Sequence, residues 1–269
     1  MLIRAGFDIA FECPAPISML LQLNVHPSRV DDLRSPDEIV TEPSLAIGAY
    51  LDHYGNRVTR VDAPAGPVVF RSDFVIRDSG EPDETPPDAP VWPVSKLPNE
   101  VLLFLISSRY CDSDNLVNFA WAKFGGLVGG RTIVQAICDF VHSHIRFSYA
   151  DASATRTASD SIREGIGVCR DFAHLAIALC RCMNIPARYC TGYLGDIGVP
   201  PDPAPMDFSA WFEVFLDGRW FTFDARHNMP RIGRVVMARG RDAADVAITT
   251  AFGTAKLLRF QVTTFEEAA

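Results

Sequence analysis

One of the seven cysteines in this 269-residue chain lies where a nucleophile could form. Cys169 follows Gly165-Ile166-Gly167 and begins an apolar stripe with helical spacing that continues to Met183. This spacing predicts a helix whose N-terminal N–H groups and macrodipole favour a thiolate at Cys169. The same N–H groups could receive the oxyanion of an attacked carbonyl. A free cysteine is more often a small buried hydrophobe, but the glycines before Cys169 favour the nucleophile.

A β-hairpin is predicted further along the chain, because Asp217-Gly218 is a two-residue turn flanked by alternating apolar residues. The turn places Leu216 opposite Arg219, so that one face of the ribbon is apolar and packs in a core. The other face brings together Ser209, Trp211 and Asp224. Trp211 could therefore form a wall of a substrate groove, or it could only cover the ribbon against another element.

Three segments resemble the core motifs of the transglutaminase-like superfamily of bacterial cysteine proteases. They are Gly-Val-Cys-Arg-Asp-Phe-Ala at 167–173, Asp-Phe-Ser-Ala-Trp-Phe-Glu-Val at 207–214 and Gly-Arg-Trp-Phe-Thr-Phe-Asp-Ala-Arg at 218–226. The resemblance covers roughly residues 149–225. It implies a papain-like Cys-His-Asp triad that acts on a peptide or protein amide through a thioester, and either hydrolyses it or passes the acyl group to an amine.

Within this resemblance Cys169 matches the nucleophile and Asp224 matches the orienting acid. The family motif reads His-Ala-Trp at the general base, whereas this chain reads Ser-Ala-Trp with Ser209 in that place. A serine hydroxyl neither accepts the thiol proton nor returns it to a leaving amine near neutral pH. Loss of acid–base catalysis lowers turnover by about 10²–10⁴, so we expect impaired thiol chemistry.

Two alternatives remain open at this stage. His227 would be a relocated base if the strand that contains Asp224 ends before it. In a continuing strand His227 would instead point to the face opposite Asp224. The other candidate, His174, lies about 140° around the helix from Cys169 and so does not face the thiol. Alternatively, the groove beside Cys169 and Trp211 binds a peptide or amide side chain without turning it over.

Composition excludes several other classes. With 25 basic and 33 acidic residues the net charge is −8, which disfavours nucleic acid and anionic membranes as partners. The uncharged stretch over 13–28 is shorter than the roughly 20 residues of a membrane span and contains prolines. Free thiols and no secretory signal predict a cytoplasmic protein. Neither a zinc-type cysteine spacing nor an acidic calcium loop is present, so we expect no metal and no cofactor.

The elements that must position this chemistry predict an α+β fold. Alternating residues over 1–80 predict an N-terminal β-rich domain, and six prolines over 81–98 predict a linker. Residues 99–269 then form the transglutaminase-like core domain, with helices packed on an antiparallel sheet. In it we expect helices over 99–110, 114–124, 132–145 and 159–164 besides that of Cys169, and strands over 186–194, 207–216, 219–225 and 256–265.

Overall fold

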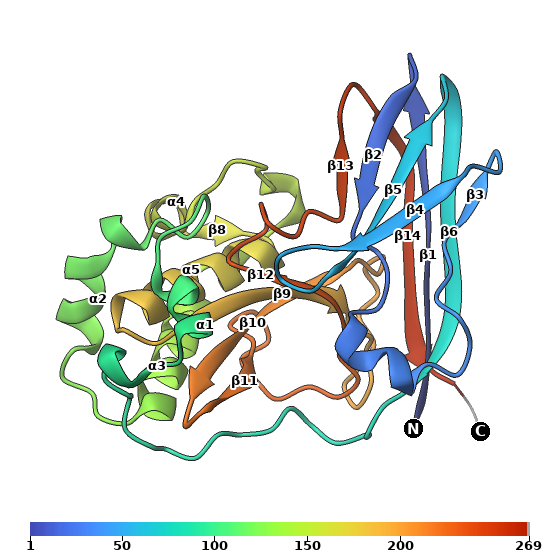
Figure 1. Cartoon of the computed structure of the whole chain (residues 1–269). Coiled ribbons are helices and arrows are strands. Elements are labelled where there is room, and N and C mark those ends of the chain that lie inside the picture. The colour runs from blue at the N-terminus through green and yellow to red at the C-terminus, as the bar shows by residue number, and fades with distance from the viewer. Residues whose placement is uncertain (268–269) are drawn as a thin grey trace.

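The computed structural model describes residues 1–267. Its N-terminal part is a sandwich of two antiparallel sheets, with strand orders β14-β1-β6-β3 and β13-β2-β5-β4 (Figure 1). The first sheet comprises β1 (Leu2–Cys13), β3 (Val40–Glu42), β6 (Gly66–Arg77) and β14 (Lys256–Glu266). The second comprises β2 (Ile17–Leu21), β4 (Ile47–Leu51), β5 (Arg57–Ala63) and β13 (Thr249–Ala251). A short 3₁₀ helix, η1 (Pro27–Asp32), follows β2.

The alternation predicted for the first strand is confirmed. Ile3, Ala5 and Ile9 of β1 are fully buried, and they pack in one core with Met19 and Leu21 of the facing sheet. Because successive side chains of a strand point to opposite faces, this alternation buries one face of β1 between the sheets.

The last two strands of the described chain return to the sandwich. β14 pairs with β1 along most of its length, from Ile3 opposite Glu266 to Glu12 opposite Lys256. β13 pairs with β2. The predicted boundaries assigned residues 99–269 to the core domain alone. In the structure this segment also supplies one strand to each sheet of the sandwich. The alternation over 256–265 predicted a strand but could not identify the strand with which it pairs.

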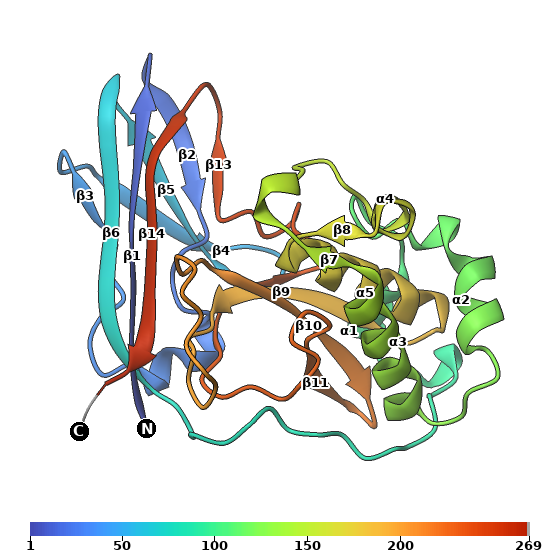
Figure 2. The ribbon, with the colours of Figure 1, turned by 180° about the vertical axis from the view of Figure 1, so that it is seen from behind.

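The core domain is built on a third antiparallel sheet of order β11-β10-β9-β12. Its strands are β9 (Ala187–Tyr193), β10 (Ser209–Leu216), β11 (Arg219–Phe223) and β12 (Val235–Gly240). The helices are α1 (Asn99–Leu102), α2 (Val117–Phe124), α3 (Gly130–His144), α4 (Ala158–Glu164) and α5 (Cys169–Cys182), with 3₁₀ turns η2 (Val94–Lys96), η3 (Leu103–Leu105), η4 (Ser113–Asn115) and η5 (Tyr149–Asp151). Two short parallel strands, β7 (Arg146–Phe147) and β8 (Ile166–Gly167), precede α5. Figure 2 shows α5 against the sheet and α2 and α3 outside it. The α+β prediction is confirmed.

The helix predicted over 99–110 is shorter in the structure, because helical geometry ends at Leu105. The buried guanidinium of Arg181 donates to the carbonyl of Ile106 at 3.0 Å and to the hydroxyl of Ser108 at 3.0 Å. These partners fix residues 106–108 outside a helix, and an apolar-periodicity pattern cannot anticipate them.

The predicted hairpin register is confirmed from Leu216 opposite Arg219 to Phe212 opposite Phe223. The pairing stops there, since β11 ends at Phe223 and not at residue 225, so the predicted pairing of Trp211 with Asp224 on the other face is wrong. Both turn residues have positive φ, 47° for Asp217 and 82° for Gly218, as a turn matched to the strand twist requires. No helix within residues 1–267 is long and apolar enough to cross a membrane.

Candidate active site

Cys169 is placed at the first residue of α5 by a close approach of the chain. A Cβ on Gly167 would lie 2.6 Å from the Cβ of Asp171, so only glycine fits there. The Asp171 carboxylate is buried, accepts from the N–H of Val168 at 2.9 Å and pairs with Arg156 at 3.2 Å. The glycine and the buried ion pair therefore fix the first turn that carries the thiol.

The Cys169 thiol is nearly covered, with 9% of the residue exposed. Burial raises the pKa of the Cys169 thiol to about 11, although the positive charge of Arg226 acts in the opposite direction. The expectation that the helix terminus would lower this pKa is wrong for the resting structure, because desolvation of the thiolate outweighs it. The thiol is consequently neutral near pH 7.

Cys169 and Ser209 line the same cleft, which has a volume of about 530 Å³. Ser209 is the first residue of β10 and is only 6% exposed. Within residues 1–267 its buried hydroxyl has no hydrogen-bond partner. A buried polar atom without a partner is uncommon. Because Ser209 lies two residues before Trp211 in β10, strand alternation places both side chains on the same face of the strand.

Asp224 directly follows β11. Burial alone would raise the pKa of Asp224, but Arg234 at 3.0 Å and His227 at 2.8 Å outweigh it and hold the pKa far below the usual range. Asp224 also accepts from the backbone N–H groups of Arg226 and His227. The carboxylate is therefore ionised and fully bonded.

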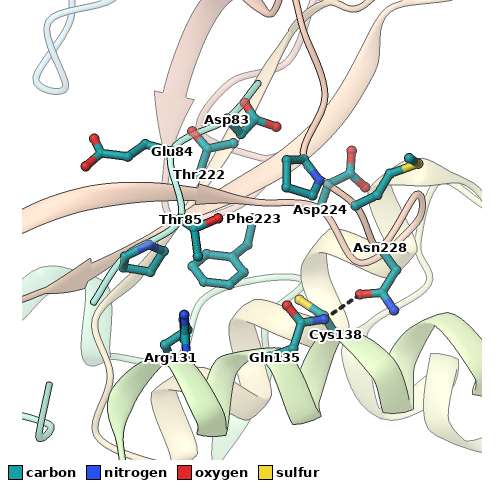
Figure 3. Close-up of a pocket in the computed structure, with 13 residues that line it drawn as sticks. Asp83, Glu84, Thr85, Arg131, Gln135, Cys138, Thr222, Phe223, Asp224 and Asn228 are labelled. Atoms are coloured by element: carbon teal, nitrogen blue, oxygen red, sulfur yellow. Dashed lines mark hydrogen bonds between the residues drawn. The ribbon is translucent and has the colours of Figure 1, made fainter. Parts of the chain in front are cut away.

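A chain of ionic contacts connects the linker to Asp224. Asp83 accepts from Nε of Arg234 at 2.8 Å, and the same guanidinium donates to Asp224. Figure 3 shows Asp83 and Asp224 at a second cavity, between the linker and α3, that Cys138 also lines. Asp224 lines this cavity and is not among the described lining residues of the Cys169 cleft, but its charge, in addition to burial, still acts on the Cys169 thiol and raises its pKa.

His227 is brought to Asp224 because β11 ends at Phe223. The chain then turns, and Nδ1 of His227 lies 2.8 Å from Asp224. His227 lines a third cavity with Arg226 and Tyr149, and residues 207–209 line both this cavity and the cleft of Cys169. The condition for a relocated base, a strand that ends before His227, is met in the structure, but the sequence does not reveal where the strand ends.

The other histidine weighed in the sequence, His174, has a structural position. It is completely buried, stacks on Tyr110 with ring centroids 5.1 Å apart, and accepts from the N–H of Ala243 at 3.1 Å. It therefore holds the segment after β12 against α5, and among the cavities described it does not line the cleft.

Trp211 does not reach the cleft of Cys169. Its side chain packs with Cys190 and Val236, beneath the guanidinium of Arg234 at 5.0 Å from the ring centroid. Ala210 and Phe212, its neighbours in β10, pack in the core around α5 instead. The alternation of the strand thus puts Trp211 on the far face of the sheet, so its predicted role in an acyl groove has no support in the geometry.

Comparison with known proteins agrees with this arrangement. The model of the transglutaminase-like superfamily matches residues 128–225, which include the candidate Cys169, Ser209 and Asp224. A crystal structure from Cytophaga hutchinsonii, described as that of a "putative cysteine protease", is 31% identical, covers 98% of this chain and 90% of its own, and superposes with a TM-score of 0.83. This chain belongs to the transglutaminase-like superfamily.

Curated proteins of mycobacteria are also similar to this chain. An uncharacterized protein of Mycobacterium leprae (strain TN) is 25% identical over 227 residues, which are 78% of this chain and 77% of that protein. An uncharacterized protein of Mycobacterium tuberculosis (strain H37Rv) is 33% identical over 129 residues, 43% of this chain and 41% of that protein. The transglutaminase-like fold thus accounts for the papain-like placement of Cys169 at a helix start beside an antiparallel sheet.

Proposed function

We propose that the protein is a thiol acyl-transfer protein of the cysteine-protease or transglutaminase type, with Cys169 as nucleophile and a low intrinsic turnover. The observation that carries this proposal is the shared cleft of Cys169 and Ser209, whose described lining contains no histidine. The thiol is available to a substrate carbonyl, but the group that should remove its proton is a hydroxyl.

The chemistry of each step explains the expected impairment. Attack requires the Cys169 thiolate, and burial disfavours that form. The first N–H groups of α5 have no partners inside the helix and can stabilise the oxyanion of the tetrahedral intermediate. Collapse to the thioester then requires a proton for the departing amine nitrogen, and Ser209 does not supply one. Esters, whose leaving groups need less protonation, should therefore react better than peptide or protein amides.

A second candidate function is favoured by the contact between His227 and Asp224. In this alternative the imidazole, oriented by Asp224 through Nδ1, carries protons with its free Nε2 past residues 207–209, which line both cavities. The protein would then be a working cysteine enzyme with a relocated base. A third reading, a peptide- or amide-binding protein without turnover, uses the same cleft.

A comparison of variants separates these functions. Ester, amide and amine-transfer turnover is measured in the native chain and in Ser209→His, His227→Gln and Cys169→Ala. We expect Ser209→His to raise turnover by about 10²–10⁴, because a histidine restores acid–base catalysis beside the thiol. Cys169→Ala should abolish the gain, and Ser44→His, which adds a histidine at an exposed site, should produce none.

Each other result decides against the first proposal. Native turnover that His227→Gln removes would establish the relocated base. Absence of turnover in Ser209→His, together with saturable binding of a peptide amide, would establish the binding function.

A further inference from the structure

The cleft of Cys169 has two walls from different parts of the chain. Tyr110 and Tyr189 stand on the core-domain side, and Tyr189 is buried. The opposite wall is supplied by the sandwich, through Phe11 of β1 and Leu257 and Phe260 of β14. The thiol therefore opens into a space whose far side is apolar and is built by residues more than 80 positions away in sequence.

Two charged residues, Arg170 and Asp207, line the cleft. The Arg170 guanidinium lies over the Tyr110 ring at 5.3 Å and donates to the carbonyl of Ser153. Burial raises the pKa of Asp207, which disfavours its charged form. Because most ligand cavities combine an apolar lining with one or two polar groups, the apolar wall formed by Phe11, Leu257 and Phe260 fits an uncharged side chain next to a carbonyl.

A β-bulge shapes the wall at β14. Phe11 pairs with Leu257 and Ala10 pairs with Arg259, so Leu258 is an additional residue without a partner in β1. A bulge bends its strand and redirects side chains, and such bulges are frequent beside functional sites. Leu257 and Leu258 are equally exposed, at 51% and 53%, but only Leu257 lines the cleft.

We propose that the cleft selects acyl donors with a large apolar side chain, aromatic or long aliphatic, and that Leu257 of β14 determines this preference. This inference rests on the proposed thiol function, since it assigns the substrate class of the same site. A volume of about 530 Å³ accommodates such a side chain together with the adjoining peptide carbonyl.

The test is the reaction of Cys169 with N-alkylmaleimides of increasing chain length, which requires no turnover. The maleimide double bond adds the thiolate sulfur at one carbon and a proton from water at the other. Rates are measured at pH 9 by mass spectrometry of the peptide that contains Cys169. Each rate is divided by the rate at which the same maleimide reacts with glutathione. Complete transfer of one methylene group from water to an apolar site increases the rate roughly fourfold, so a partly open cleft should increase it about twofold for each methylene. We expect the normalised rate to increase at least tenfold from N-methyl to N-hexylmaleimide.

Two matched variants assign this selectivity to its wall. Leu257→Asp should reduce the tenfold gain to less than threefold, because a carboxylate faces the alkyl chain. Leu258→Asp changes a residue of the same type and exposure that does not line the cleft, and it should retain the gain.

The outcomes distinguish this inference from the proposed function. A flat series in the native chain would overturn the apolar selection, while turnover in Ser209→His would still support thiol catalysis. Equal loss in both leucine variants would overturn the role of Leu257. Failure of even N-methylmaleimide to label Cys169 would contradict an accessible thiol and sink both proposals.

Discussion

The two faces of β10 are both buried, but they are stabilised by different interactions. On the face toward α5, Ala210, Phe212 and Val214 join the largest apolar core around the helix. On the other face Glu213 lies between Arg188 at 2.6 Å and Arg239 at 3.2 Å. A single strand therefore places an apolar core and an ion-pair network on opposite sides of one sheet.

The ion-pair face connects separate parts of the chain. Arg239 reaches the hydroxyl of Ser28 in the sandwich, at 3.1 Å, as well as Glu213. Arg234 connects Asp83 of the linker with Asp224. Apolar contacts stabilise a fold without specifying one arrangement, whereas buried, hydrogen-bonded charges require defined partners. We therefore infer that the ion pairs on this face determine the position of the linker and the sandwich relative to the core domain.

The largest effect is expected from Glu213→Gln. Burial would raise the pKa of Glu213, but Arg188 and Arg239 lower it, so the folded state contains a buried carboxylate with two cations. Removing the carboxylate charge leaves two arginines uncompensated and should lower the free energy of unfolding by about 3–5 kcal/mol, measured by urea denaturation. Glu84→Gln, which breaks an exposed pair with Arg219, should leave the midpoint unchanged. A loss below 1 kcal/mol in Glu213→Gln would refute the importance of the network.

On the apolar face the matching change is Leu216→Ala. Leu216 is buried in the core around α5, and its side chain would contact a Cβ built on Gly130 of α3. We expect a loss of about 3 kcal/mol from transfer and cavity formation, with no dependence on salt. A clear salt dependence of this loss would show that the two faces are not energetically distinct.

The linker contact should give a smaller effect. Asp83→Asn weakens the charge-assisted bonds to Arg234 and should lower the free energy of unfolding by about 2 kcal/mol. Asp83→Asn combined with Arg234→Met should be less harmful than the sum of the two single changes, because the pair is removed together. Simple additivity in this double-mutant cycle would mean that the linker does not act through Arg234.

The smallest effect is expected from acid. Burial, with Arg170 and Arg181, lowers the pKa of His174 well below 6.5, and burial lowers the pKa of His26 to about 4. The unfolded chain binds these protons near pH 6.5 and the folded chain does not, so stability is complete above pH 6.5 and decreases below it. Between pH 6.5 and 5.5 the slope of the unfolding free energy against pH should be at most about 1.4 kcal/mol per pH unit for each histidine, a smaller loss than that from Asp83→Asn. His174→Gln should reduce the slope and exposed His53→Gln should not; equal slopes in both variants would contradict this assignment.

Local signals in the sequence anticipated much of the site. The glycines before Cys169, the helical spacing after it and the turn at Asp217-Gly218 act over a few residues, and the helix start and the hairpin register follow from them. The serine at 209, where the resemblance implies a histidine, belongs to a contiguous motif around Trp211, and its role at the base position stays a prediction.

Features that depend on distant contacts were not predictable. Arg234 as the partner of Asp224, the cleft wall at Leu257 and the pairing of β14 with β1 all join segments that no local pattern relates. The predicted position of Trp211 in the groove was wrong for the same reason. Both faces of β10 are buried, so the sequence does not reveal which face lies toward Cys169. The end of β11, which decides the position of His227, depends on the bonds that Asp224 makes with residues after the strand.

The pairing of Ile3 with Glu266 has a consequence for biosynthesis. On the ribosome the first strand emerges long before its neighbour β14 is translated, so one edge of its sheet stays open and the nascent chain must wait for a contact of very high sequence separation. The thiol-bearing helix will already have left the exit tunnel, but the apolar lining at Leu257 will not exist yet. Selectivity for the acyl group should therefore appear only late in synthesis, after the helix that carries the thiol has formed.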